Sequence, residues 1–383
     1  MHFKQKVTTG LALAALCGLG TAVPASAAPG SSSWTETNLG SVQVTSVQAV
    51  GPGVTWVAGA EVTTDQASGA TSFAPVLYQQ DLTKGEAWQR LPVSFPGWDS
   101  RSNDLALARD GSAYLVGDMA GKDTGILVGR YAAGRWNVSA DTALPAGTTD
   151  ASLLSVSAVS AREAWAVGQA DLQDGVAQVP LVQHWNGQAW QLVNIPVPGF
   201  DQWTLTQVQE VAPDDVWVVG NDNATGQALV AHWDGVAWKR IATPTFPDSS
   251  VLFDITARSA SDIWAVGWYR DTDKERPLGL ALHWDGRSWS QLPLPAGTFA
   301  LNSVALQPAG GIAVVGGNDD AAVGLTWDPA RGWQSLQLPE TNPGQPLGVW
   351  TIAAAPGRLT ITGWHYISSD FGDTFQSGVI LTR

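Results

Sequence analysis

Several tryptophans of this 383-residue chain stand beside side chains that form strong hydrogen bonds. An indole can stack on the apolar face of a sugar ring, while carboxylates, guanidinium groups and phenols bond the sugar hydroxyls. The residues that this pattern selects are Trp98, Asp99, Asp201, Trp203, Asp222, Trp268, Tyr269, Arg270, Trp364 and His365. The pattern predicts a carbohydrate-binding site in which the tryptophans stack and the polar groups bond hydroxyls. The same rings could instead anchor a partner protein, or plug a channel and support loops.

Other chemistry-bearing residues lack the spacing of a catalytic or metal site. The single cysteine, Cys17, lies in an N-terminal segment that we expect to be removed, so thiolate chemistry is not expected. His184, His232 and His283 fall in separate repeats and should not converge on one metal ion. No serine elbow, HExxH helix or phosphate loop occurs. We therefore expect no enzyme, metal or cofactor. A glycan-active hydrolase or lyase stays open, because acidic loops could supply a carboxylate pair.

An internal repeat must position these residues. A strand that ends in glycine recurs seven times, at Gly59, Gly117, Gly168, Gly220, Gly267, Gly316 and Gly363. The clearest repeat has four short apolar segments, Leu153–Val159, Glu163–Gly168, Leu181–Trp185 and Ala189–Val193. An Asn-Gly or Asp-Gly pair between the third and fourth segments is typical of a tight hairpin. Four antiparallel strands per unit predict an all-β, seven-bladed β-propeller over residues 29–383, as a single domain.

The repeat is out of phase with the chain ends. A strand around Trp34 precedes the first full unit, whereas the last unit ends at its third strand, Val379–Thr382. We expect the N-terminal strand to complete the last blade and close the ring, which removes two exposed sheet edges.

Most of the 20 tryptophans follow the repeat and should pack between blades. Five do not: Trp98, Trp203, Trp268, Trp350 and Trp364. They fall on connections from the fourth strand to the next first strand, or from the second strand to the third. These connections emerge on one face of a propeller, so the predicted site lies on that face.

The N-terminal sequence indicates where the protein is located, and the net charge limits which partners it can bind. Lys4 and Lys6 precede an apolar run from Leu11 to Leu19 and the small residues Ala25-Ser26-Ala27, which indicates a signal peptide over residues 1–28. We therefore expect a secreted, extracellular protein without a membrane span. The net charge of −14 opposes binding to nucleic acid.

The sixth unit has a double glycine followed by spaced aromatic residues, Val314-Val315-Gly316-Gly317, then Trp327-Asp328-Pro329 and Trp333. In these residues the chain resembles a kelch-like propeller. The AWAVG…HWDG…W pattern is similar to that of exported bacterial propellers, including lectin subunits of secreted assemblies. The resemblance implies a lectin-like recognition module for a glycan or cell-surface polysaccharide. The alternative is a protein-docking scaffold, or a subunit of an exported toxin or adhesion assembly that contacts another secreted protein.

Overall fold

The computed structural model describes residues 34–65, 68–95, 99–120, 125–172, 178–274, 276–318, 321–339, 347–368 and 374–383. The chain from Trp34 to Arg383 forms one compact unit. Its regular elements in the described ranges are β-strands and two short 3-10 helices, η1 (Leu82–Lys84) and η2 (Phe200–Gln202). The expected all-β class is therefore confirmed.

Five sheets have four strands each in the described part of the chain, and the sixth has eight. Four of the smaller sheets each consist of four consecutive strands. The first contains β2 (Val42–Gly51), β3 (Val54–Thr64), β4 (Thr71–Asp81) and β5 (Gln89–Arg90), and the second contains β14 (Trp203–Ala212), β15 (Asp215–Asp222), β16 (Gln227–Trp233) and β17 (Trp238–Arg240). The third contains β18 (Ser250–Ser259), β19 (Asp262–Tyr269), β20 (Leu278–Trp284) and β21 (Trp289–Gln291), and the fourth contains β22 (Leu301–Leu306), β23 (Ile312–Asn318), β24 (Ala321–Asp328) and β25 (Gly332–Ser335).

The eight-stranded sheet consists of two consecutive four-strand runs. They are β6 (Asp99–Leu107), β7 (Ala113–Ala120), β8 (Ile126–Ala132) and β9 (Arg135–Asp141), then β10 (Thr148–Ser160), β11 (Glu163–Leu172), β12 (Gln178–Trp185) and β13 (Trp190–Leu192). One register pair, Ser152 opposite Asp118, joins the runs. Within each run the strands pair antiparallel in sequence order, as in the smaller sheets.

The last sheet combines the two ends of the described chain. β26 (Leu347–Ala355), β27 (Arg358–Ser368) and β28 (Thr374–Thr382) pair in order, and β1 (Thr35–Asn38) adds to β28. Thr35 lies opposite Thr382, and the indole of Trp34 donates a hydrogen bond of 3.0 Å to the carbonyl oxygen of Gln337. The N-terminal strand thus completes the last sheet, as the sequence predicts.

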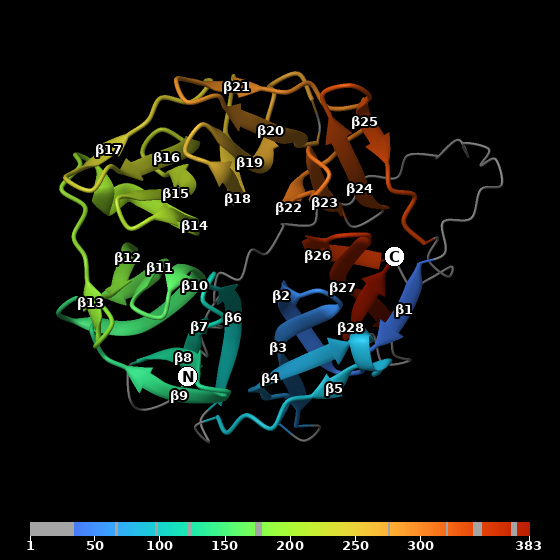
Figure 1. The fold of residues 1–383 in the computed structure, drawn as a ribbon. Helices are drawn as coiled ribbons and strands as arrows, with labels where there is room; N and C mark the ends of the chain where they lie inside the picture. The colour runs from blue at the N-terminus through green and yellow to red at the C-terminus, as the bar shows by residue number, and fades with distance from the viewer. Residues whose placement is uncertain are drawn as a thin grey trace. The chain divides into compact units, whose positions relative to one another are not determined.

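The first strand of each four-strand run lies toward a common centre (Figure 1). Each of these strands contacts the first strand of the next run, in the order β2, β6, β10, β14, β18, β22 and β26, and β26 contacts β2. Hydrogen bonds also join the first strands of neighbouring runs. In each, a polar side chain of one first strand donates to a backbone carbonyl oxygen of the next first strand. The bonds are Thr45 to Ser102, Asn103 to Leu153, Thr206 to Leu252 and Asn302 to Val349.

The recurring glycine marks a close approach of two backbones. A Cβ atom on Gly168 would lie 1.9 Å from the carbonyl oxygen of Ser152. The same approach, at 1.8 to 2.3 Å, occurs at Gly59, Gly117, Gly220, Gly267, Gly316 and Gly363. In β10 the register shifts between Leu153 and Ser155, immediately after the crowded carbonyl. A bulge that presses the first strand against the second therefore requires glycine at this position.

Tryptophans fill the space between neighbouring sheets, as predicted for those that follow the repeat. Trp165 of β11 meets Trp238 of β17 edge to face at 5.6 Å, and Trp217 meets Trp289 in the same way at 6.0 Å. All four are at most 7% exposed. A large part of the core therefore lies between the sheets.

Candidate functional site

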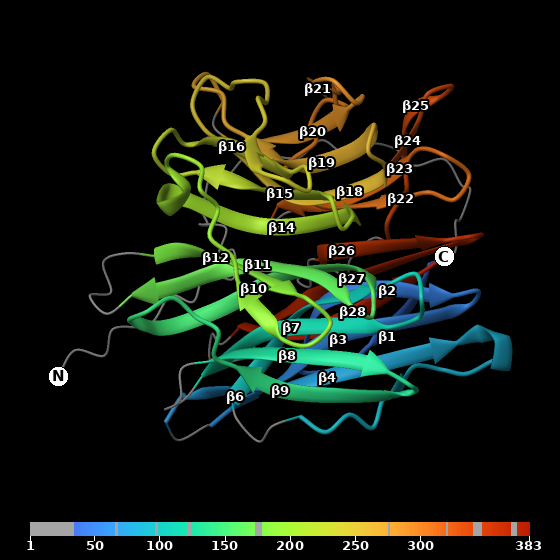
Figure 2. The same ribbon diagram turned by 60° about the vertical axis from the view of Figure 1, so that its left-hand side comes forward.

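The connections between strands gather at two ends (Figure 2). At one end, the connections that lead into the first strand of each run lie beside the connections between the second and third strands. We call this end the loop end. There, Asn223 donates its backbone N–H to Gln202, and Arg270 donates to Ser249, at 2.8 and 2.7 Å. The remaining connections form the turn end, where the N–H of Leu82 donates to the carbonyl of Gly53. The predicted site residues that the structure describes belong to segments of the loop end.

Two of the predicted site residues are buried. Trp203 is 2% exposed and packs edge to face on Phe200, with ring centroids 5.6 Å apart. Asp222 is 4% exposed and accepts a hydrogen bond of 2.6 Å from Arg240. Neither presents a free ring face or carboxylate to a ligand, so we leave both out of the candidate site.

Trp268, Tyr269 and Arg270 form the most open group of predicted residues. Trp268 is half-buried at the end of β19, and Tyr269 lies against Phe246 with ring centroids 4.7 Å apart. The exposed guanidinium of Arg270 lies 4.0 Å from the carboxylate of Asp248. The partly exposed rings of Trp268 and Tyr269 therefore lie close in sequence to one cation, Arg270, which faces one anion, Asp248.

Trp364 and Trp350 form an aromatic pair, and Trp364 also packs against the chain itself. Trp364 lies against Gly348, and its ring is 5.6 Å from that of Trp350. His365 Nε2 donates a hydrogen bond of 3.0 Å to Glu36 Oε1. This contact joins β27 to β1, which gives His365 a place in the closure of the last sheet.

The other predicted residues are scattered along the loop end. Asp99 accepts the backbone N–H of Phe73 at 2.5 Å, and exposed Asp201 accepts a bond of 3.1 Å from Gln202. Trp98 lies outside the described residues. The contacts described above therefore join the predicted residues in local groups.

The loop end is acidic within the described ranges. Its acidic residues are Glu61, Asp65, Asp99, Asp118, Asp141, Asp150, Asp171, Asp201, Asp222, Asp248, Asp271 and Asp273. Its basic residues are Arg90, Arg101, Arg240, Arg270, Lys274 and Arg276. Four of these bases face an acid already: Arg90 with Glu61, Arg101 with Asp118, Arg240 with Asp222 and Arg270 with Asp248. The acids exceed the bases, so this end carries a net negative charge.

The turn end is closer to neutral, because acids and bases alternate along its connections. Its ion pairs include Lys84 with Asp81, Lys239 with Asp234, Arg258 with Asp262 and Arg331 with Asp328. The net charge of −14 is thus distributed unevenly between the two ends.

A repeated acid, tryptophan and histidine group at the turn end escaped the sequence analysis. Asp215 Oδ1 accepts hydrogen bonds from Trp217 Nε1 at 2.7 Å and His232 Nε2 at 2.8 Å. The imidazole stacks on the indole at 4.1 Å because the two residues are register partners. Asp262, Trp264 and His283 repeat this group in the next sheet.

These groups hold neighbouring strands together, and one carboxylate oxygen in each accepts two hydrogen bonds. Burial alone would raise the pKa of Asp262, but the bonds from His283 and Trp264 keep it below its usual value. The spacing of acid and histidine was visible in the sequence. Their contact depends on the strand register, which the sequence did not give.

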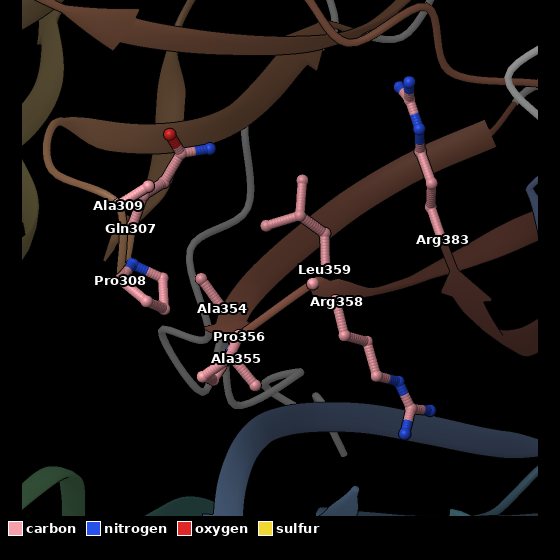
Figure 3. Close-up of a pocket in the computed structure, with 10 residues that line it drawn as sticks. Gln307, Pro308, Ala309, Ala354, Ala355, Pro356, Arg358, Leu359 and Arg383 are labelled. Atoms are coloured by element: carbon pink, nitrogen blue, oxygen red, sulfur yellow. The ribbon is translucent and has the colours of Figure 1, made fainter. Parts of the chain in front are cut away.

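A pocket of about 530 Å³ lies at the turn end, between the β22–β23 and β26–β27 connections. Its lining residues include Pro308, Ala309, Ala354 and Pro356. Figure 3 shows the guanidinium groups of Arg358 and Arg383, which also line it, pointing in different directions. The pocket therefore offers an apolar lining without convergent polar groups.

Within the described ranges, no cluster of three or more His, Cys, Asp or Glu side chains is arranged to hold a metal ion. Over the same residues, no helix is long and apolar enough to cross a membrane.

Comparison with known proteins identifies the fold. No protein-family model and no curated protein matches the chain. Among solved structures, YCF48 bound to D1 peptide is 14% identical, with a TM-score of 0.57, covering 93% of this chain and 98% of that one. Virginiamycin B lyase from Staphylococcus aureus is 10% identical, with a TM-score of 0.58 and coverages of 92% and 100%.

A third similar structure is a fungal alcohol oxidase of the AA5 family in complex with copper. It is 14% identical, with a TM-score of 0.53, and the match covers 91% of this chain and 76% of that one. At these identities the likeness concerns the fold alone, and the fold is that of a β-propeller.

Proposed function

We propose that this chain is a seven-bladed β-propeller that serves as a secreted binding scaffold and docks a basic protein segment on its loop end. Its mode of action is binding, without turnover. The number of blades, the export and the docking each have their own support.

The blade count rests on a local contact. The close approach of a carbonyl at the start of the first strand to the repeat glycine of the second strand occurs once in each four-strand run, including both runs of the eight-stranded sheet. Those two runs share only the pair Ser152 and Asp118 in their registers, so we count them as two blades. The kelch-like resemblance fits this count.

Export rests on the N-terminal sequence. The basic, apolar and small-residue stretches of residues 1–28 have the order of a signal peptide. A secreted protein without disulfides needs other means of holding its sheets together. The hydrogen bonds between first strands and the tryptophans between sheets meet that need.

The observation that carries the docking proposal is the acidic loop end beside half-buried aromatic rings. Excess carboxylates attract a cationic segment and speed its association. The partly exposed rings of Trp268 and Tyr269 lie at this end, with Tyr269 packed on the buried Phe246, and aromatic anchors commonly dominate protein interfaces. The YCF48 structure, which holds a peptide, is a precedent for peptide binding on a related fold.

A second candidate is carbohydrate binding, and Trp268 favours it. Its indole is half-buried and has Arg270 close by in sequence for hydroxyl groups. A lectin site built there would resemble that of the exported propellers named above. Trp268→Ala would then abolish binding, whereas removal of loop-end charges would matter less.

The test compares two soluble peptides that share their apolar residues, one rich in Lys and Arg and the other in Asp and Glu. Binding is measured by fluorescence anisotropy at low and at high salt. We expect the basic peptide to bind, and salt to weaken it. The triple variant Asp201→Asn, Asp248→Asn, Asp273→Asn should bind less.

The matched control is Asp234→Asn with Asp285→Asn, which removes two carboxylates from the turn end and should leave binding unchanged. Equal binding of both peptides, or no binding of either, would contradict the docking proposal. A glycan array in parallel, with Trp268→Ala as the variant, decides for or against the carbohydrate candidate.

A further inference from the structure

Glu210 is a buried acid that none of the interactions described so far uses. It lies on β14, is 3% exposed, and its two carboxyl oxygens are buried without a hydrogen-bond partner. Its backbone N–H donates to Ser157 Oγ of β10 at 2.9 Å. The side chain is therefore held at the interface between the β10–β13 run and the β14–β17 sheet.

The position is unusual for an acid. Glu210 pairs with Val216, four residues before the glycine of its second strand. The residues at the same register position in the other four-strand runs are Ala49, Leu107, Ala158, Ala257, Leu306 and Ala354. All are apolar, so the fold itself does not require a carboxyl group here.

The surrounding charges disfavour an ionised carboxylate. Glu163 of β11, which bonds His184 of β12 at 2.5 Å, acts on Glu210 with a like charge. Burial raises the pKa of Tyr114 of β7, and Glu210 in turn adds to this rise. Burial, followed by the charge of Glu163, raises the pKa of Glu210 to about 8, and the backbone N–H of Val159 of β10 opposes this rise only in part. The carboxyl group is therefore mainly protonated at neutral pH.

Two further strands pack against β14, and their charged groups complete the surroundings. β18 carries Asp254 and Arg258, and β15 carries Asp215 and Asp222. Arg258 and Asp222 already have partners of opposite charge. Asp215 bonds His232, and Asp254 accepts the backbone N–H of Val304.

We propose that Glu210 is a proton-controlled latch, which keeps this interface closed while its carboxyl group is protonated and loosens the interface when it ionises. An unpartnered carboxylate is costly in an apolar interface, and hydration in an opened state removes that cost. Opening would also release Trp203 and Val208, which lie on the same strand and pack in the same cluster. This device does not depend on the docking proposal.

Linkage gives the pH response. The open state has the ordinary pKa of a solvated glutamic acid and the closed state a raised one, so opening releases a proton. The equilibrium constant for opening then rises about tenfold per pH unit between about pH 5 and about pH 8, and becomes constant above that range. The interface is tightest in mild acid.

Hydrogen exchange with mass spectrometry, corrected for the intrinsic rate at each pH, tests the latch. The measurement covers about pH 6.5 to about pH 8, which lies above the titration of the buried Asp104 and Asp254, because their pKa values are raised to about 6. In this window, β10 and β14 of the wild type should lose protection more than about tenfold. The β18 and β22 segments, which share Asp254, serve as the internal control and should stay constant.

Three variants complete the test. Glu210→Gln and Glu210→Ala, the latter matching the alanines at equivalent positions, should abolish the pH response of β10 and β14. His184→Gln removes the nearby imidazole, and the response should persist. A flat wild-type profile, or a pH response that survives in both Glu210 variants, would overturn the proposal. Loss of the response in His184→Gln alone would assign the effect to the histidine instead.

Discussion

At the scale of single residues, the repeated glycine is a steric requirement. We predict that Gly168→Ala lowers the free energy of unfolding by about 3 kcal/mol, because overpacking against fixed backbone commonly costs this much. The new methyl group would overlap the carbonyl oxygen of Ser152. Chemical denaturation measures the change. Gly51→Ala is the control, because nothing lies within 4 Å of its Cβ position, and an equal loss in both variants would contradict the steric account.

Two tryptophans should respond very differently to substitution. Trp238 is 6% exposed and packs against Trp165, so Trp238→Ala should lower the free energy of unfolding by about 3–5 kcal/mol. Trp268 is half-buried, so Trp268→Ala should lower the free energy of unfolding clearly less and should instead weaken ligand binding. Thermal unfolding compares the two. A similar drop in Tm for both would count against Trp268 as a surface residue.

The sequence predicted where these rings occur but not which way they point. Trp203 and Trp268 both depart from the repeat, and connectivity alone puts both at the loop end. Phe200 and the cluster around Trp165 enclose Trp203, whereas Trp268 stays partly exposed. Ring orientation depends on neighbours that are distant in sequence, which no local pattern encodes. The same limit hid the bond between Asp215 and His232.

At the scale of elements, β1 carries the closure of the last sheet. Deletion of residues 31–40 removes its pairing with β28, the Trp34 contact and the hydrogen bond that His365 donates to Glu36. We expect β28 to become an unpaired edge and the Tm to fall by several degrees, since the loss of a few kcal/mol has this effect. Limited proteolysis should then cut first near β26–β28. An unchanged Tm and digestion pattern would show that the closure adds no stability.

Elements were more predictable than side chains because strand period and hairpin dipeptides are local signals. The segment Glu163–Gly168 is the start of β11, and Leu181–Trp185 is the end of β12. The short outer strands, such as β13 and β17, were also expected. The bulges in the first strands were not, because they arise from contact between neighbouring strands rather than from composition.

At the scale of the whole molecule, buried acids should make stability depend on pH. Burial, opposed by hydrogen bonds from Val156 and Ser46, raises the pKa of Asp104 to about 6, and that of Glu210 is raised to about 8. A raised carboxyl pKa means that the native state holds a proton which the unfolded state releases. Stability therefore falls as pH rises from about 4 to about 8.

Other carboxylates set the acid limit. Hydrogen bonds, led by that from Ser112, hold the pKa of Asp110 below its usual value, so its contribution is lost when strong acid protonates it. We expect the free energy of unfolding to peak near about pH 4. Urea unfolding at several pH values measures it. Stability that is equal or higher at about pH 8 than at about pH 5 would contradict this prediction.

The uneven distribution of charge between the two ends underlies the functional account. A hydrogen-exchange footprint, recorded with and without a saturating basic peptide, tests it most directly. The account predicts protection in the β13–β14, β17–β18 and β19–β20 connections at the loop end, with the β14–β15 and β18–β19 turns unchanged. Protection confined to the turn end, or none at either end despite measurable binding, would contradict it.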